Sequence, residues 1–460
     1  MTQLAAANAA IAAHRFGLGE ASLSALQSDP RGWLLAQIGP ADAPRGDDLL
    51  STRQALEHVK AEADKRRLAK NPPTGTTAEQ LLAGHYREVT LADARSRLLT
   101  AAATQRPFTE RLLLFWANHF TVSLAKGSAR GLVGAFERDA IRPHIAGTFE
   151  QLLVASTTHP AMLRYLDNQQ SAGPHSRAVA FAARRARQMD EGPRLTGLNE
   201  NLAREILELH TLGVNGGYAQ TDVTSFAAVL TGWRVGLKQI DVDQRFDPAW
   251  HEPGRKTVLG KSYPEGADAL RDVLHDLARH PSTAKFLATK LARHFVADDP
   301  PAALVDRLAA SYLRSDGQLG EVYRELVRSP LAWNPVPVKL KTPEEFVLSS
   351  ARVLGLNERM FARRDGAGIV GLGQRIHAAP SPAGWSDRAD DWLGPDAVWK
   401  RVEWATRVGE RMGHTLDARA LADASLGPVL SDDSRQQIER AADGAQAVAL
   451  LLMAPEFQRR

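Results

Sequence analysis

Residues 107–122 read PFTERLLLFWANHFTV, and this stretch decides the fold class. Between Leu112 and Phe120, a helix drawn on the sequence is apolar on nearly every side. A helix of that kind is buried, so we expect residues 107–122 to lie in the middle of a helical protein. Asn118 and His119 interrupt the apolar run near its end. Because buried polar groups need hydrogen-bond partners, we expect these two side chains to cap the helix or to project into an internal pocket.

Helical patterns also dominate the rest of the 460-residue chain. Residues 342–356 begin with a capping box formed by Thr342 and Glu345. The Ala-rich N-terminus is predicted to be a helix that ends at Gly17. We expect further helices near residues 51–70, 78–104, 131–154, 265–279, 280–298, 302–315, 319–328, 396–412 and 433–453.

Residues 233–262 break this pattern, because β-branched and aromatic residues are mixed there with proline and glycine. We expect a short β-hairpin or an irregular arm. The fold class is therefore predicted to be mainly α, a large multi-helix bundle-like fold with this arm. We expect an N-terminal helical lobe over residues 1–235, the arm over 236–263 and a C-terminal helical lobe over 264–460.

Composition narrows the class of protein. Lys and Arg number 57 against 53 Asp and Glu, so the formal net charge is only +4. That balance gives no reason to expect nucleic acid as a partner. The absence of cysteine excludes disulfides, thiolate metal sites and a cysteine nucleophile. The N-terminus lacks a signal-peptide pattern, and no apolar run reaches the roughly 18 residues of a membrane span, so we expect a cytoplasmic protein.

Three stretches are expected to form loops without a catalytic or binding role. The composition of residues 69–77 predicts an exposed turn. Residues 170–199 are expected to hold an Arg-rich helical segment between two loops. Residues 254–262, GRKTVLGKS, look like a phosphate-binding loop, but five residues separate the two glycines where that loop has four. We therefore expect no nucleotide site there.

Residues 201–223, NLAREILELHTLGVNGGYAQTDV, hold the densest cluster of side chains that carry chemistry. On a helix of about 3.6 residues per turn, Glu205 and Glu208 share one face with Arg204 beside them. His210 points the other way. Glu205 and Glu208 are therefore candidates for a pair of metal ligands or for an acid/base pair.

The same residues permit a structural interpretation. Glu200, Arg204 and Glu208 are spaced to form an i, i+4 charge ladder on a solvated face. His210 lies on the apolar side of the helix, where we expect a hydrogen-bonded core histidine. Both interpretations of the helix remain open at this point.

A tight reversal is expected after this helix. Gly213 suits a left-handed C-cap, and residues 215–217, Asn-Gly-Gly, permit positive φ. Thr221 is then expected to cap a second helix with Asp222 in its first turn. Such a reversal accounts for the glycines without excluding a ligand, because two helix ends and their backbone amides meet there.

Nine segments of the chain, taken in order, resemble a large bacterial family catalogued as domain of unknown function 1800. They are AAHRFGLG, FWANHFTVS, RYLDNQQSAGPHS, GLNENLAREILELHTLGVNGGYAQTDV, LTGW, HEPGRKTVLGK, HPSTAKFLATKLARHFVADDPP, KLKTPEEFVLSSARVLG and PSPAGWSD. The resemblance spans nearly the whole chain and implies a mostly helical protein. It also implies a gene that neighbours one of a second uncharacterised family, many of whose members look exported. Members often carry an N-terminal export or extension segment, so a periplasmic location is possible in related proteins; from its N-terminal pattern we expect no such segment in this chain.

The most distinctive family stretches hold more polar residues than helix packing requires. In this chain they contain Asn118, His119, Asp167, Asn168, Asn199, Glu200, Asn201, Arg204, Glu205, Glu208, Gly213, Gly217, Asp222 and Trp233. We therefore expect a site between the helix that ends at His119, the loop at residues 167–168 and the 200–210 helix.

Two functions of different classes remain open. In the first, the chain is an enzyme in which Glu205 and Glu208 act in catalysis, assisted by Arg204 and Asn118. His119, Glu205 and Glu208 would together bind a divalent metal ion, which is the only cofactor that the sequence indicates. The metal would support oxidative or hydrolytic chemistry. In the second, the chain is a non-enzymatic binding or maturation protein for a partner encoded nearby. Its carboxylates and arginines would then form buried ion pairs or a docking surface.

Overall fold

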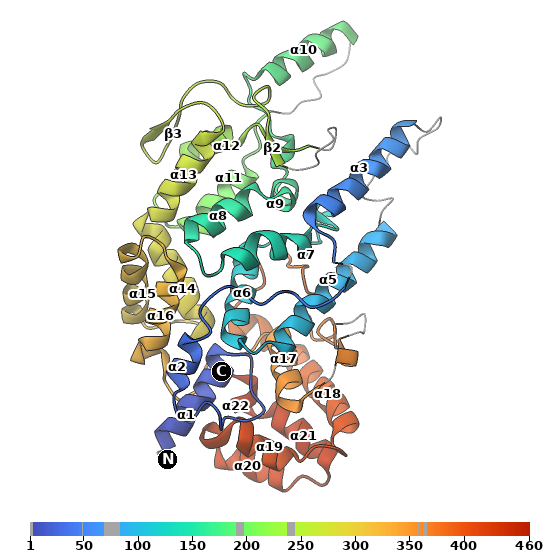
Figure 1. Cartoon of the computed structure of the whole chain (residues 1–460), viewed down its shortest axis with the longest axis vertical. Helices are drawn as coiled ribbons and strands as arrows, with labels where there is room; N and C mark the ends of the chain where they lie inside the picture. The colour runs from blue at the N-terminus through green and yellow to red at the C-terminus, as the bar shows by residue number, and fades with distance from the viewer. Residues whose placement is uncertain are drawn as a thin grey trace.

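The structure is a computed structural model that describes residues 3–47, 49–68, 83–189, 197–236, 244–356, 358–361 and 366–460. Within these ranges the protein is mainly α, as predicted, and its strands form two small antiparallel pairs. Figure 1 shows an elongated molecule in which the C-terminal helices lie at one end, next to the N-terminal helix α1, and α10 projects at the other end.

Short helices joined by tight turns build the first half of the chain. The predicted buried helix is α6, in which every residue from Pro107 to Trp116 is buried. The bounds are α1 (Gln3–Ile11), η1 (Ala12–Phe16), α2 (Pro30–Leu35), α3 (Thr52–Leu68), α5 (Ala83–Ala103), α6 (Pro107–His119), η2 (Gly127–Ala129), α7 (Val133–Phe136), η3 (Glu137–Ile141), η4 (Arg142–His144), α8 (Phe149–Thr158), α9 (Pro160–Tyr165), η5 (Asn168–Gln170), α10 (Arg177–Met189), α11 (Asn201–Glu205), η6 (Ile206–Thr211) and α12 (Gln220–Leu230).

The predicted arm consists of two hairpins. Strand β1 (Trp233–Val235) pairs with β2 (Gln244–Phe246), and β3 (Lys256–Val258) pairs with β4 (Lys261–Tyr263). The second hairpin contains most of the GRKTVLGKS stretch, which therefore does not form a phosphate-binding loop. At its turn, the Leu259 amide donates a hydrogen bond to the Asp222 carboxylate (2.7 Å) and so ties the hairpin to α12.

Longer amphipathic helices build the second half. The capping box of α17 is present as predicted, since the Thr342 amide donates to Glu345 (2.9 Å) and the Glu345 amide to the Thr342 hydroxyl (3.3 Å). The bounds are α13 (Asp268–Arg279), α14 (Pro281–Phe295), α15 (Ala302–Arg314), α16 (Leu319–Arg328), η7 (Pro330–Ala332), α17 (Pro343–Leu354), η8 (Glu358–Met360), η9 (Ala389–Trp392), α18 (Pro395–Met412), α19 (Ala418–Ser425), η10 (Gly427–Val429), α20 (Asp432–Glu439), α21 (Gly444–Met453) and α22 (Pro455–Gln458).

Two helices that were expected to be continuous are interrupted. The expected helix over 131–154 is divided among α7, η3, η4 and α8, because Pro143 has no amide proton to continue a helix and Thr148 caps a new one. The expected helix over 433–453 is divided between α20 and α21, because the Asp443 side chain caps the second of them. The Arg-rich segment is helical as expected (α10), whereas the expected turn at 69–77 lies outside the described residues.

The core consists of two hydrophobic clusters. The first joins buried side chains from residues 9–333, and the second joins residues 346–457 with a few earlier ones. Helix α6 borders both clusters, because Leu113 belongs to the first and Leu114 to the second. This position explains why α6 is apolar on nearly every side. The lobes placed at 1–235 and 264–460 stay a prediction.

The described helices include none that is both long enough and apolar enough to span a bilayer.

Candidate functional site

The corner predicted at residues 201–223 is built from α11, η6 and α12. The helix changes from α to π geometry at Ile206, and the Leu212 amide bonds to the carbonyl of Leu207, five residues earlier (2.9 Å). The Thr211 hydroxyl donates to the Ile206 carbonyl (2.6 Å). A π turn holds more residues than an α turn, so it shifts side chains from the angles that an α-helix predicts.

Glu205 and Glu208 lie half-buried on this helix, and each has a tyrosine nearby. Burial raises the pKa of Glu205, and the charge of Glu208 raises it further. The Tyr218 hydroxyl donates to Glu208 Oε2 (3.4 Å). Burial, with a smaller contribution from Glu205, raises the pKa of Tyr165 to about 12. Sequence reasoning missed both tyrosines, and no local spacing connects Tyr165, on α9, with the carboxylates.

Part of the expected charge ladder is present. Arg204 Nη2 lies 3.0 Å from Glu200 Oε2, an i, i+4 ion pair. Glu200 also accepts hydrogen bonds from the Thr224 hydroxyl (2.6 Å) and from Gln220 Nε2 (2.8 Å). These hydrogen bonds lower the pKa of Glu200. Glu200 and Arg204 therefore join α11 to α12, and Glu208 has a hydrogen bond with Tyr218 instead.

The reversal after η6 differs from the expectation in one respect. Helix α12 begins at Gln220, so the expectation that Thr221 caps it was wrong. Ala219 is the N-cap residue, and the Asp222 carboxylate in the first turn accepts a hydrogen bond from the Ala219 amide (2.8 Å). Gly213 has a positive φ of 81°, as expected. A Cβ atom there would lie 2.7 Å from Cδ2 of Phe286, so the close approach of α14 also requires glycine.

His119 lies in the core beside His210. Its Nε2 donates to the His210 carbonyl (3.1 Å), and the two ring centroids are 6.0 Å apart. Burial, reinforced by the charge of Lys290, lowers the pKa of His119 well below its ordinary value. The same two causes lower the pKa of His210 to about 3. Both imidazoles are therefore neutral near pH 7. His210 lies in the core as expected, but neither of its ring nitrogens has a hydrogen-bond partner among the described residues, so the expected hydrogen bond is not present.

The predicted ligands do not come together as a metal site. His119 reaches the 200–210 helix through the His210 backbone, not through Glu205 or Glu208. In the part of the chain that the structure describes, no three His, Asp or Glu side chains are grouped so that they would hold a metal ion. The physical reason is that His119 points into an aromatic core, whereas Glu205 and Glu208 are half-exposed.

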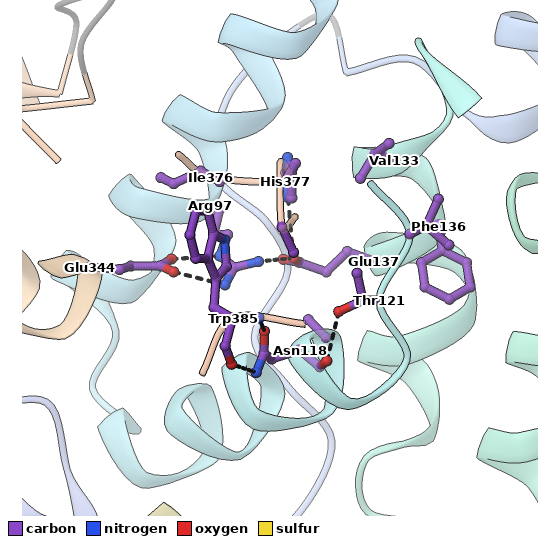
Figure 2. A pocket seen from close by; sticks show the side chains of 13 residues that line it. Arg97, Asn118, Thr121, Val133, Phe136, Glu137, Glu344, Ile376, His377 and Trp385 are labelled. Carbon is purple, nitrogen blue, oxygen red and sulfur yellow. Dashed lines mark hydrogen bonds and ion pairs between the residues drawn. The ribbon is translucent and has the colours of Figure 1, made fainter. Parts of the chain in front are cut away.

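Asn118 holds the loop of the PSPAGWSD segment (Figure 2). Its Nδ2 donates to the Trp385 carbonyl and its Oδ1 accepts from the Trp385 amide, both at 2.8 Å. The neighbouring Gly384 has no room for a side chain, since a Cβ atom would lie 2.5 Å from the Asn118 carbonyl oxygen. These contacts join two family segments, and the catalytic role predicted for Asn118 stays a prediction.

A small cavity lies beside Asn118, between α5, α6, η3 and residues 376–385 (Figure 2). Its volume of about 30 Å³ suits one or two water molecules. Four charged or titratable side chains line it, and they come from segments far apart in the sequence: Arg97, Glu137, Glu344 and His377.

Arg97 is the centre of this buried network. It donates to Glu137 Oε2 (2.8 Å) and, through Nε and Nη2, to both carboxylate oxygens of Glu344 (2.7 and 3.1 Å). His377 Nε2 lies 3.4 Å from Glu137 Oε2. Burial alone would raise the pKa of Glu137, but Arg97, His377 and Arg142 together hold it well below its usual range. The arginine and both carboxylates are paired with one another, so the network stabilises the fold.

The profile of a protein family described as "Protein of unknown function (DUF1800)" matches residues 11–459. The chain belongs to this family. No match was found among the curated proteins or among the solved structures that were compared. The resemblance drawn from the nine segments is therefore confirmed.

In this DUF1800 chain, two of the three segments that we expected to meet at one site are in contact, and the third has other partners. His119 bonds to the 200–210 helix at His210. In the 167–168 loop, Asn168 Nδ2 donates to the carbonyls of Leu230 (3.1 Å) and Trp233 (3.0 Å). The polar residues of the DUF1800 stretches thus serve several junctions between elements.

Proposed function

We propose that this DUF1800 chain is an enzyme in which Glu205 and Glu208 carry out acid–base chemistry. The observation that carries the proposal is the half-buried carboxylate pair, in which burial and the charge of Glu208 raise the pKa of Glu205. Two carboxylates in different environments divide into a proton donor and an ionised partner. In this scheme Glu205 donates the proton, and Glu208, which accepts a hydrogen bond from Tyr218 (3.4 Å), is the partner carboxylate that activates water.

Other residues have supporting roles in this scheme. Arg204 is a positioning residue, because its guanidinium binds Glu200 and Gln220 and so fixes α11 against α12. Tyr165 keeps its proton near pH 7 and supplies a donor beside Glu205. Asn118 and His119 have no part in it, and no step runs through a metal ion, because the described residues supply no third His, Asp or Glu ligand there. The reaction class is hydrolysis, which needs only a proton donor and a carboxylate that activates water.

The test is a carboxyl titration followed by NMR on protein labelled with ¹³C in its glutamate side chains. The Glu205 signal, assigned as the one lost in Glu205→Gln, should titrate above the ordinary value of about 4.3. In Glu208→Gln its pKa should fall, because the neighbouring negative charge has been removed. Glu200 is the internal control and should titrate below the ordinary value.

The matching activity test is a panel of esters, phosphate esters and glycosides. Any hydrolysis found should fall by about 10²-fold or more in Glu205→Gln, as expected for loss of a general acid. A Glu205 carboxyl with an ordinary pKa that does not respond to Glu208→Gln would overturn the proposal.

Partner binding is the second candidate function, and exposed apolar side chains just before and within the first turns of α18 favour it. Leu393, Val398 and Trp399 are 41%, 37% and 62% exposed, and apolar residues grouped on a surface mark interaction sites. An ordinary pKa for Glu205 would make this the better supported function.

A further inference from the structure

A second hollow lies next to the small cavity, and the two are lined by neighbouring residues of the same two loops. Its volume is about 540 Å³, which falls within the range of roughly 300–1,000 Å³ typical of small-molecule sites. Helix α5 forms one side, residues 124–130 the second and residues 375–378 the third. Glu205 and Glu208 do not line it, so this inference is independent of the proposed acid–base chemistry.

Three arginines line this hollow, one from each side: Arg87, Arg130 and Arg375. All three are exposed. Across the ranges that the structure describes, none of the three guanidinium groups has a carboxylate partner, and no Asp or Glu lines the hollow. Arg97, in the adjoining cavity, is by contrast paired with two carboxylates. Like charges brought together without a counterion repel one another, and a bound anion would remove that cost.

Hydrogen bonds and close packing fix the three sides relative to one another. The Leu124 amide donates to the His377 carbonyl (2.9 Å), and the Ser123 hydroxyl donates to the Ala379 carbonyl (2.7 Å). These bonds join the second side to the third. On α5, the Tyr86 ring packs so closely on Gly131 that a Cβ atom at position 131 would lie 2.5 Å from Cε1 of the ring. The backbone that carries the arginines is therefore preorganised, which reduces the entropy lost on binding.

The lining also indicates what kind of anion fits. Guanidinium groups bind phosphate and carboxylate oxygens through paired N–H donors, and three of them match more than one anionic group. Leu91, Leu124 and Ala378 add carbon surface, and Thr90 adds a hydroxyl. We propose that this hollow binds a small organic anion that carries two or more phosphate or carboxylate groups.

Isothermal titration calorimetry on the full chain tests this site, with inorganic pyrophosphate and citrate as the two probes at low ionic strength. We expect one site per chain for at least one probe. Arg375→Gln and Arg130→Gln should each weaken binding by about tenfold or more, since each removes charge-assisted hydrogen bonds. Arg375→Lys keeps the charge but not the paired donors, so its loss should be smaller.

The matched control is Arg314→Gln, which changes an exposed arginine on α15 away from the hollow. It should leave the affinity within about twofold, as expected for a distant surface charge in high dielectric, and thermal melts should show that every variant folds. Tighter binding of pyrophosphate assigns the phosphate class, and tighter binding of citrate the carboxylate class. Failure of both probes to bind the wild type, or an equal loss in Arg314→Gln, overturns the proposal.

Discussion

The Asn118 carboxamide joins α6 to the loop that contains Trp385, because it both donates to and accepts from the Trp385 backbone. Asn118→Ala leaves that amide and carbonyl without these partners. We expect the free energy of unfolding to fall by about 2 kcal/mol, measured by urea denaturation. Asn215→Ala, at an exposed asparagine in the reversal, should change it by less than about 0.5 kcal/mol. Equal effects of the two substitutions would show that the Asn118 contacts do not stabilise the fold.

The partner of Asn118 also shows how far sequence reasoning extends at the scale of single residues. The apolar run around Asn118 and His119 indicates that both need hydrogen-bond partners. The partner of Asn118 is 267 residues away in the sequence, and that of His119 is a backbone carbonyl 91 residues away. No local pattern specifies either pairing, because tertiary packing creates it.

At the scale of elements, the corner between η6 and α12 offers a matched pair of glycines. Gly213 and Gly217 both have positive φ, of 81° and 90°. An added Cβ would meet Phe286 at position 213 but nothing within 4 Å at position 217. Gly217→Ala should therefore cost about 1 kcal/mol of stability, from the left-handed backbone alone.

Gly213→Ala should cost about 2 to 4 kcal/mol, because overpacking against Phe286 adds to the backbone strain. Thermal denaturation of both variants gives the comparison. A loss for Gly213→Ala no larger than that for Gly217→Ala would mean that α14 moves aside at no cost.

Elements differ in how much of them the sequence reveals. The apolar period of α6 and the capping box of α17 identified both helices, because each signal lies within a few neighbouring residues. The division of residues 131–154 was missed even though Pro143 marks it. The π turns of η3 and η6 were not predicted, because the helical angles were drawn for an α-helix throughout.

At the scale of the whole molecule, buried neutral histidines predict how stability depends on pH. Burial lowers the pKa of His14 and His210 to about 3 and that of His159 to about 4. In the unfolded chain these groups take up protons below about pH 6.5. The unfolded state therefore binds more protons than the folded state from about pH 6.5 down to the folded pKa values. Stability should fall through this window, by about 1.4 kcal/mol per pH unit for each histidine.

Urea unfolding measured at several values between pH 8 and pH 5 checks this dependence. In His210→Asn, the free energy of unfolding should depend less steeply on pH below pH 6.5, by about 1.4 kcal/mol per pH unit, because one buried histidine has been removed. His414→Asn, at an exposed position, should leave the slope unchanged. A stability that is constant between pH 7 and pH 5 would contradict the neutral state of these side chains.

The sites assembled by the whole chain are those that the sequence conceals most. Arg97, Glu137 and His377 meet in one cavity, and Arg87, Arg130 and Arg375 line one hollow. Within each set, the three residues come from three different helices or loops. The net charge of +4 does not reveal such clusters, because it sums all charged side chains and does not show which of them lie close together.

The position of α6 between the two hydrophobic clusters limits how this gene can be divided. Leu113 faces one cluster and Leu114 the other, so a fragment that contains either cluster without α6 would expose an apolar groove. If recombination exchanged one half of the gene, α6 would have to pack against the old hydrophobic cluster on one side and the new one on the other. The family profile, which covers residues 11 to 459, includes α6 together with both clusters.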